Sequence, residues 1–464
     1  MAFSDFIGLS VNDTALEIKV SNVMLRSLIQ DSLYRDGVGI TEVFSSGAGI
    51  GGAVLQVPKI TNATGQFRTL GAAHDGAFFS ANAAAISSLT EVLLVCKHIY
   101  TDMEDVPEAQ HVLSLAGGSA VGIRAERIAK QIAKQMNAGT MAYQLKAVIN
   151  AVITAAAETN RIFTYTEGTE GSALGAFLDA SSALDDGDGD YNDYFPVIGR
   201  IALLRPSCIN ELRKKGNVIV NGSNFAQDIM RTGAVDAETV LPEIVTGYRG
   251  MINDTAVFMA TQALWTQAES WLGVPAGYLD KINGIICAAT ATGRGHAFPD
   301  QTKVIDSPSG VGLRIQPLSN FGVEVFFEGG IKLLADGTFV EGSVALAVEA
   351  PGSVLAVAPT GVTITGAATV AKDATITLTA TVAAALDGSK YAVMWSSADA
   401  TKLTVGTTYT YTTVSTCVIT PVANDAGTLV TAQIMAISYV NGVKTYTALA
   451  TPLTDTHDVA TTGF

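Results

Sequence analysis

The residues most able to carry chemistry in this sequence form an acidic turn near residue 190, inside a loop-rich region at 159–194. Carboxylates alternate there at Asp186, Asp188 and Asp190, and oxygen ligands at this spacing can wrap around a hard cation such as Ca²⁺. The EF-hand pattern is not kept, because Tyr191 stands where the sharp-turn glycine belongs and Val197 where the bidentate glutamate belongs. Two interpretations stay open: a weak metal site on these three carboxylates, or a solvated acidic turn.

Other residues typical of catalysis are scattered along the chain. The five histidines form no HxxxH or HExxH pair, so no histidine metal site is predicted. No glycine-rich stretch ends in the Lys-Ser or Lys-Thr of a phosphate-binding loop, and no GxSxG elbow or dinucleotide fingerprint is present. Residues 293–296, Gly-Arg-Gly-His, are either an anion nest or a glycine turn with two exposed cations, and the turn is favoured. The sequence thus predicts a structural protein with no enzymatic activity and no cofactor.

The composition favours packed sheets and interfaces over a strongly solvated monomer. The chain has 464 residues, of which 48% are hydrophobic and 15% charged, and this length predicts about two to four domains. With 28 basic and 43 acidic residues, the formal net charge is −15. Such a chain lacks the basic surface of a protein that recognises a nucleic-acid sequence, but it can enclose DNA without binding it tightly.

Targeting signals and the spacing of cysteines indicate the cellular compartment in which a chain folds. No apolar run approaches the roughly 20 residues that span a bilayer, and the N-terminus lacks the basic and continuous apolar regions of a signal peptide. Cys96, Cys208, Cys287 and Cys417 contain no CxxC pair and lie among apolar residues. We expect buried thiols, no membrane segment and assembly in a reducing cytoplasm.

A long helix is predicted between Pro107 and Glu158, and the rest of the chain is organised around it. Apolar residues recur at helical steps at Val121, Ala125, Ile128, Ile132 and Met136. Such a stripe is typical of a helix packed along one side. The pattern pauses at Asn137–Thr140 and then resumes, which predicts a break in the helix at that point.

The opposite face of this helix is polar and carries Arg124, Arg127 and Lys134. Two roles are open for these cations. The favoured role is a plain solvated face, and the other is contact with carboxylates of a neighbouring copy of the chain.

Two strands are predicted at Ala53–Ile60 and Leu89–Thr101, with the long segment 61–88 between them. An unsupported loop of this length is unusual in a compact domain. It is therefore either a surface lid or a projection that lies across a neighbouring copy. The residues best suited to such contacts are Phe67, Arg68, Phe78 and Phe79.

After the Pro/Gly-containing stretch 351–361, the composition changes to short alternating strands rich in Thr, Val and Ala. Strands with turns every 8–12 residues or so predict a β-sandwich. Asn441-Gly442, between two apolar-alternating runs, predicts a two-residue hairpin. The last residues, 454–464, are predicted to form a mobile tail.

The order of these elements resembles the major capsid proteins of tailed bacteriophages, which share the Hong Kong 97-like fold. The resemblance covers about residues 1–350 and lies in an arm, a long two-stranded excursion, a long helix, an α/β region and returning strands. It implies an α+β phage capsid fold. The implied segments are an N-terminal arm at 1–52, an E-loop at 53–105, a spine helix and peripheral domain at 106–194, an axial domain at 195–300 and peripheral return strands at 301–350.

Residues 362–452 resemble bacterial immunoglobulin-like (Big) domains, after a linker at 351–361 and before a tail at 453–464. The matching runs, in order, are Val362–Ile364, Ile376–Val382, Val393–Asp399 and Ala426–Ala432. The resemblance implies an all-β immunoglobulin-like sandwich with Trp395 as the buried core indole. It also implies packing without the antibody-type disulfide, because Cys417 has no partner cysteine in this domain.

Together the two resemblances imply a major capsid protein of a virion, which self-assembles in the host cytoplasm into hexamers and pentamers around double-stranded DNA. The DNA would be contained and not read, and the immunoglobulin-like domain would lie on the exterior. Besides copies of itself, the expected partners are portal, scaffolding and cement proteins. The alternative is a phage tail or cell-surface adhesion protein with a Big domain. An enzyme with an appended immunoglobulin-like module is disfavoured because no catalytic constellation is present.

Some proteins of this kind link an E-loop lysine covalently to an asparagine of a neighbour. Segment 61–88 contains no lysine here, and Lys59 and Lys97 lie on the flanking strands. We therefore predict that assembled particles run at the position of the monomer on a denaturing gel. A ladder of bands above the monomer would contradict this expectation.

Overall fold

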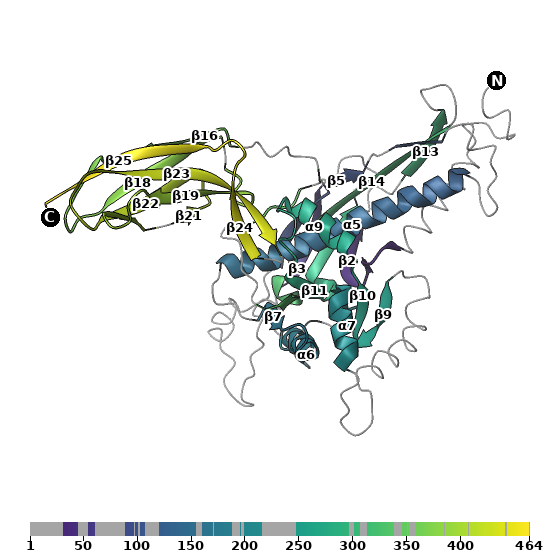
Figure 1. Ribbon diagram of the computed structural model, residues 1–464. Coiled ribbons are helices and arrows are strands. Elements are labelled where there is room, and N and C mark those ends of the chain that lie inside the picture. Colours follow the sequence, from purple (N-terminus) through teal and green to yellow (C-terminus); the bar gives the residue numbers. More distant parts are fainter. Residues whose placement is uncertain are drawn as a thin grey trace, which may run out of the picture. The chain divides into compact units, whose positions relative to one another are not determined.

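The computed structural model describes residues 31–44, 54–60, 89–96, 98–100, 103–106, 120–154, 160–169, 171–187, 195, 199–215, 247–296, 301–306, 313–337, 346–349, 351, 359–384, 386–406, 408–440 and 443–463. The chain divides into two compact units (Figure 1). The first takes most of the chain up to Gly337, and the second takes residues 268–281 with the C-terminal part from Thr338. Both helices and sheets are present, so the fold is mixed α+β.

A seven-stranded sheet in the first unit joins strands that are far apart in the sequence. It contains β1 (Arg35–Asp36), β2 (Gly39–Phe44), β12 (Thr292–His296), β14 (Leu313–Val325) and β13 (Gln301–Asp306), with β5 (His98–Tyr100) and β6 (Glu104–Val106) also paired to β14. β2 and β12 run parallel, while the partners of β14 run antiparallel to it. This sheet therefore forms only when the N-terminal segment meets strands from the far end of the unit.

A six-stranded sheet supplies the second layer of the first unit. Its strands, in spatial order, are β7 (Ile162–Tyr165), β15 (Ile331–Asp336), β11 (Ile282–Cys287), β8 (Ile201–Leu204), β10 (Thr255–Met259) and β9 (Tyr248–Ile252). β8 and β11 are buried at every position, which accounts for their continuous apolar sequences. Each sheet draws strands from both sides of the predicted 300/301 boundary, because β12 and β13 lie together in the first sheet and β11 and β15 in the second.

Short helices cover the six-stranded sheet. α6 (Ser172–Asp185) packs against β7 and β15, and α7 (Pro206–Lys215) packs against β11 and α6. α9 (Gln262–Leu272) follows β10, and one-turn 3₁₀ helices lie at Ala289–Ala291 and Glu328–Gly330.

The predicted long helix is one continuous element, α5 (Ala120–Thr154), of 35 residues (Figure 1). At about 1.5 Å rise per residue its length is about 50 Å. The predicted break at Asn137–Thr140 is wrong, because these residues are helical and buried. Thr140 Oγ1 donates to the Met136 carbonyl at 2.8 Å, and Asn137 bonds to the backbone of residues 31–33. Thr140 is therefore satisfied within the helix itself, and Asn137 by tertiary partners.

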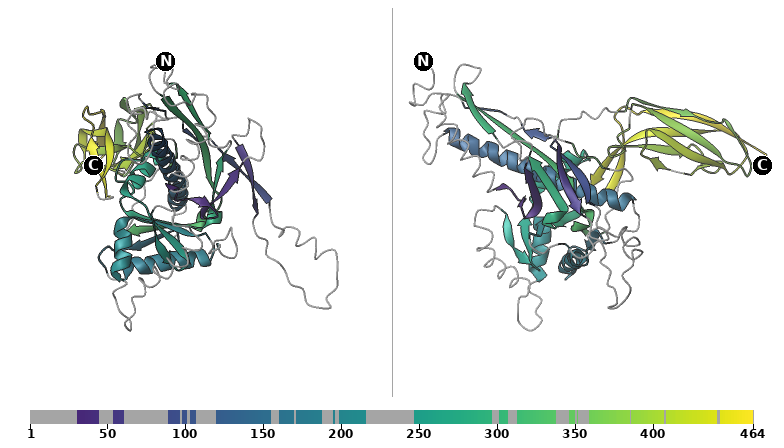
Figure 2. Two further views of the ribbon diagram at one scale, coloured as in Figure 1. Left: turned by 90° about the vertical axis from the view of Figure 1, so that its right-hand side faces the viewer. Right: turned by 180° about the vertical axis from the view of Figure 1, so that it is seen from behind.

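β3 (Val54–Ile60) and β4 (Leu89–Val95) form an antiparallel pair with Val54 opposite Val95. Among the described strands they make a two-stranded sheet of their own, although β4 also approaches β12 and β14. The left view of Figure 2 shows this pair beside the other strands of the unit. β3 lies where the sequence predicts a strand, but the single strand predicted at Leu89–Thr101 is two strands, β4 and the β5 of the seven-stranded sheet. Segment 61–88 lies outside the described residues.

Two segments that the sequence suggested were loops are regular elements. Residues 293–296 belong to strand β12, and both Arg294 and His296 are buried, so the favoured interpretation of an exposed glycine turn is wrong. A Cβ at Gly293 would lie 2.2 Å from the Phe326 ring, which shows that the glycine permits close packing. Region 159–194 likewise contains β7 and α6.

The second unit contains a two-sheet β-sandwich. One sheet has the order β16 (Gly361–Thr365), β18 (Ile376–Ala383), β22 (Val414–Pro421), β20 (Leu403–Val405). The other has the order β17 (Thr369–Ala371), β25 (Thr454–Thr462), β23 (Asp425–Val440), β19 (Tyr391–Ser397), β21 (Tyr409–Thr410), with β24 (Val443–Ala448) also paired to β23. The inward residues of both sheets form one apolar core.

Several sequence predictions can be compared with this sandwich. Trp395 is 1% exposed, and its Nε1 donates to Ser415 Oγ at 2.8 Å. β23 and β24 form a hairpin with Val440 opposite Val443, as predicted, while residues 441–442 lie outside the described part of the chain. All four cysteines of the chain are described and buried, and none forms a disulfide, so the prediction of buried thiols is confirmed.

The prediction of a mobile tail at 453–464 is wrong. Residues 454–462 form β25, which pairs antiparallel with β23 and parallel with β17. Val459 is 0% exposed and Thr461 is 1% exposed. The strand signal was hidden because most of the side chains of β25 are polar, so few apolar residues mark its inward side.

We predict that truncation after Pro452 unfolds the sandwich, because β23 and β17 lose the strand between them and the core loses Val459. The expected result is loss of the sandwich's thermal transition and rapid proteolysis of residues 359–452. Removal of Gly463 and Phe464 alone is the control and should leave the transition unchanged. If the sandwich melts at the same temperature in both truncated chains, β25 does not stabilise it, and the interpretation of these residues as a mobile tail would hold.

Candidate functional site

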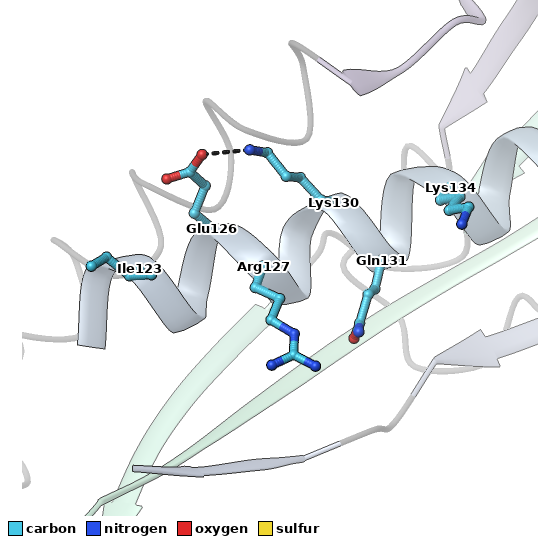
Figure 3. A pocket seen from close by; sticks show the side chains of 6 residues that line it. All are labelled: Ile123, Glu126, Arg127, Lys130, Gln131 and Lys134. Carbon is cyan, nitrogen blue, oxygen red and sulfur yellow. Dashed lines mark hydrogen bonds and ion pairs between the residues drawn. The ribbon is translucent and has the colours of Figure 1, made fainter. Parts of the chain in front are cut away.

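The exposed side of α5 carries a row of long polar side chains. Arg127, Lys130 and Lys134 are exposed and Arg124 is half-buried. A shallow hollow of about 330 Å³ lies on this side, lined by Ile123, Glu126, Arg127, Lys130, Gln131 and Lys134 (Figure 3). The helix therefore brings the three predicted cations, Arg124, Arg127 and Lys134, onto one element.

Interactions within this row hold some of its side chains. Lys130 Nζ donates to Glu126 Oε1 at 2.7 Å, and this bond raises the pKa of Lys130. The pair has the i, i+4 spacing that supports a helix modestly. Tyr100 of β5 donates to Gln131 Oε1 at 3.3 Å. In Figure 3, Arg127 and Gln131 point to the side opposite Glu126 and Lys130, so Arg127 lies apart from the Glu126–Lys130 ion pair.

The middle of α5 is buried and forms hydrogen bonds to the N-terminal segment through an amide side chain. Asn137 Oδ1 accepts the Leu33 N–H at 3.1 Å, and Asn137 Nδ2 donates to the Asp31 carbonyl at 2.9 Å. One side chain thus binds the peptide backbone on both sides of residue 32, in the way that a neighbouring strand would. Because Asn137 is 3% exposed, these bonds replace bonds to water that the amide cannot make.

A second amide holds the next residue of that segment. Tyr34 Oη donates to Gln144 Oε1 at 2.7 Å, and Gln144 Nε2 donates to Thr292 Oγ1 at 3.2 Å. Both Tyr34 and Gln144 are 0% exposed. Burial raises the pKa of the Tyr34 phenol well above its ordinary value, so the hydroxyl keeps the proton that it donates. Helix α5, residue 34 and strand β12 are connected by this chain of bonds.

Residues 39–44 then complete the insertion of the N-terminal segment. In the parallel pairing of β2 with β12, Glu42 lies opposite Arg294 and forms an ion pair with it. Arg294 is 3% exposed, and a buried charge of this kind requires a partner. Gly39 has a φ of +74°, its N–H donates to the Gly199 carbonyl at 2.8 Å, and a Cβ there would lie 2.3 Å from Ile201. Only glycine fits this crossing of the two sheets.

The remaining predicted site residues are not brought together by the described structure. Phe67, Arg68, Phe78 and Phe79 lie outside the described residues, as do Asp188 and Asp190. Asp186 follows the end of α6 and is exposed. Within the described ranges, no group of three or more His, Cys, Asp or Glu side chains is arranged to hold a metal ion. None of the described helices is both long enough and apolar enough to cross a bilayer.

Sequence reasoning missed the residues that connect α5 to the N-terminal segment. Asn137 and Gln144 were the available signal, since amides inside a long apolar stretch of helix need a buried partner. Their partners at residues 31–34 could not be identified, because nothing in the local sequence of that segment marks it as an acceptor of these bonds.

We predict that Asn137→Leu destabilises the unassembled chain by about 1–3 kcal/mol, because the buried Leu33 amide loses its acceptor. The measurement is the free energy of unfolding from urea denaturation. Lys134→Gln, one turn away on the exposed side, should change that free energy by no more than about 0.5 kcal/mol. Similar values for both variants would show that the buried amide does not hold the segment.

No protein-family model matches this chain, and no curated protein matches its sequence. Among solved structures, it is similar to the acidic stable capsid structure of Helicobacter pylori bacteriophage KHP30, with 10% identity, a TM-score of 0.41, and coverage of 67% of this chain and 90% of that chain. The mature capsid of bacteriophage PhiM1 has 10% identity and a TM-score of 0.39, and the match covers 67% of this chain and 90% of that chain. A structure from Mycobacterium phage Che8 has 13% identity and a TM-score of 0.35, and the match covers 61% of this chain and 84% of that chain.

Proposed function

We propose that this chain is the major shell protein of a tailed-bacteriophage head. Copies of it assemble into hexamers and pentamers that enclose double-stranded DNA, and its role is structural and not catalytic. What supports this function is the chain's own architecture, which combines a long helix tied to the N-terminal segment with a separate two-stranded pair, β3–β4.

The observation that carries the proposal is the β3–β4 pair. An isolated two-stranded sheet is marginally stable in water, yet both strand sequences, VLQVPKI and LTEVLLV, are largely apolar. Among the described strands, β3 and β4 pair only with each other. In this proposal a neighbouring copy covers the pair and buries further apolar area, at roughly 25 cal/mol per Å² before association costs.

The frame that holds this pair is well suited to repeated assembly. α5 is anchored through Asn137 and Gln144 to the inserted segment at 31–34, and this fixes the base of the N-terminal arm. The arm and the E-loop can then reach neighbours from a defined position. In this proposal Phe67, Arg68, Phe78 and Phe79 contact the adjacent copy.

The cations of α5 have a corresponding role in the proposal. Arg124, Arg127 and Lys134 meet carboxylates of a neighbouring copy, which the chain's net charge of −15 makes abundant. Because these side chains are at least partly exposed, each pair contributes little alone, and the benefit lies in the orientation of the copies.

The sandwich is proposed to be an immunoglobulin-like domain displayed on the outside of the shell. Its core, which includes Trp395 and Cys417, is contributed by strands of both its sheets. A domain that closes its own core does not need the shell for stability, and so it suits a position beyond the shell surface.

The first test is negative-stain electron microscopy of the purified full-length protein. Closed icosahedral shells or capsomer rings are expected. Tubes or fibres would instead favour a tail or adhesion protein with a Big domain, and a discrete monomer under all assembly conditions would overturn the shell function.

We further predict that deletion of residues 351–464 leaves shell assembly intact, because the shell contacts lie in the first unit. Particle yield and diameter are measured by microscopy and sedimentation against the full-length chain. A collapse in yield would show that the sandwich takes part in assembly and is not a display domain.

A further inference from the structure

The hairpin of β23 and β24 extends beyond the other strands of its sheet, at one end of the sandwich (Figure 1). Along β23, pairing with β19 ends at Ala436 and pairing with β25 ends at Gln433. From Ile437 to Val440, β23 therefore pairs with β24 alone among the described strands. Because a two-stranded ribbon is marginally stable by itself in water, this part of the hairpin needs a packing partner.

The two faces of this ribbon differ in burial. Residues that lie opposite each other share a face, and the register places on the first face Ile437, Tyr439, Lys444 and Tyr446. Val440 and Val443 lie on the second face and are 60% and 58% exposed, whereas Ile437 is 6% exposed. The first face is therefore the one that packs, and three of its four residues are large.

Tyrosines of the sandwich hold the β24 side of the packed face. Tyr446 stacks on Tyr409 of β21, with ring centroids 3.9 Å apart and an interplanar angle of 9°. The hydroxyls of Tyr446 and Tyr411 form a hydrogen bond of 2.5 Å. Lys444 Nζ lies 4.7 Å from the centroid of the Tyr411 ring, which adds a cation–π contact.

The β23 side of the packed face meets a segment from the middle of the chain. Residues 268–281 belong to the second unit together with the sandwich. The rings of Tyr439 and Tyr278 pack edge to face, with centroids 5.1 Å apart and planes at 84°. A Cβ at Gly277 would lie 3.0 Å from the Tyr439 carbonyl oxygen and 3.5 Å from the Tyr439 Cβ. The glycine thus lets the backbones of the turn and the hairpin approach closely.

The turn that carries Tyr278 is held from beneath by its own hydrogen bonds. The Tyr278 N–H donates to the Pro275 carbonyl at 3.2 Å, and the Leu279 N–H donates to Glu269 Oε1 at 2.9 Å. Glu269 on α9 is 4% exposed and Tyr278 is 3% exposed. A buried carboxylate therefore fixes the turn to the end of α9, and the Tyr278 ring is presented in one position.

We propose that the turn at residues 273–281 is the docking surface of the β23–β24 hairpin, and that this contact anchors the sandwich non-covalently. The sandwich core ends at Ile434 on β23, so the ribbon beyond it is not needed to close that core. Burial, with Tyr278 beside it, raises the pKa of the Tyr439 phenol, which agrees with a contact that excludes water. The chain connection through residues 338–360 is then not the sandwich's sole attachment. The inference does not depend on the proposed shell function, because both partners lie in one chain.

The first test is hydrogen exchange of the unassembled full-length chain, followed by mass spectrometry of its peptides. In Tyr439→Ala we expect the peptide that covers residues 273–281 to exchange about tenfold faster, since an edge-to-face pair and its buried area are lost. Val443→Ala, on the exposed face of the same hairpin, is the matched control and should leave that peptide unchanged. The peptide of β18 should exchange equally in all three chains.

The second test is a disulfide between the two partners. The 3.5 Å separation at Gly277 lies within the range of Cβ distances in disulfides. Under mild oxidation, the pair Gly277→Cys with Tyr439→Cys should form a linked peptide within one chain, and Gly277→Cys with Val443→Cys should not. Gly277 has a φ of +84°, and the strain of a cysteine there is the same in both pairs. The four native cysteines are buried, so they do not compete.

Three results would overturn the anchor. One is unchanged exchange of residues 273–281 in Tyr439→Ala. Another is faster exchange of β18 in that variant, which would make the hairpin part of the sandwich core. The third is a disulfide pattern that does not favour the Tyr439 pair over the Val443 pair. Since both tests use unassembled chain, failure to form shells would overturn the shell function and leave the anchor standing.

Discussion

The first unit depends on one constraint: the amide side chains that α5 carries into its buried middle must be hydrogen-bonded. Asn137 and Gln144 meet this need with the backbone of residues 31–33 and the hydroxyl of Tyr34. A buried polar group without a partner costs on the order of a few kcal/mol, a large part of a typical domain's net stability. The helix and the inserted segment are therefore stable together and poorly stable apart.

The inserted segment also joins the two sheets of the unit. β2 pairs with β12 in the seven-stranded sheet, while the Gly39 N–H donates to Gly199 and the Gly39 carbonyl accepts from Cys287 Sγ, next to strands of the six-stranded sheet. Because these partners are far from residue 39 in the sequence, the native contacts are mostly non-local. Such an arrangement folds slowly compared with local topologies. Once formed, the inserted segment cannot leave without breaking bonds in both layers.

The same constraint explains how far the sequence could predict this fold. Periodicity located α5 well, since its apolar stripe is a local property, and alternation located β3, β4 and the sandwich. The break predicted at Asn137–Thr140 failed because polar residues in a helix look alike in sequence whether they meet water or a buried strand. Arg294 in β12 presents the same difficulty, as its partner Glu42 comes from the other end of the unit. β25 was missed for the opposite reason, because only Val459 and Thr461 mark its buried side.

Part of the candidate surface could be predicted from the sequence, because residue spacing alone places Arg124, Arg127 and Lys134 on one helix. The spacing of residues along the sequence does not show which elements find packing partners when the chain folds. The sandwich closes a core around Trp395 from its own strands, and the inserted segment is completed by α5 and β12, so neither needs a second molecule for stability. β3 and β4 pair only with each other among the described strands, although β4 also lies close to β12 and β14. That pairing depends on which strands meet after folding, so it could not be read from the residues of either strand alone.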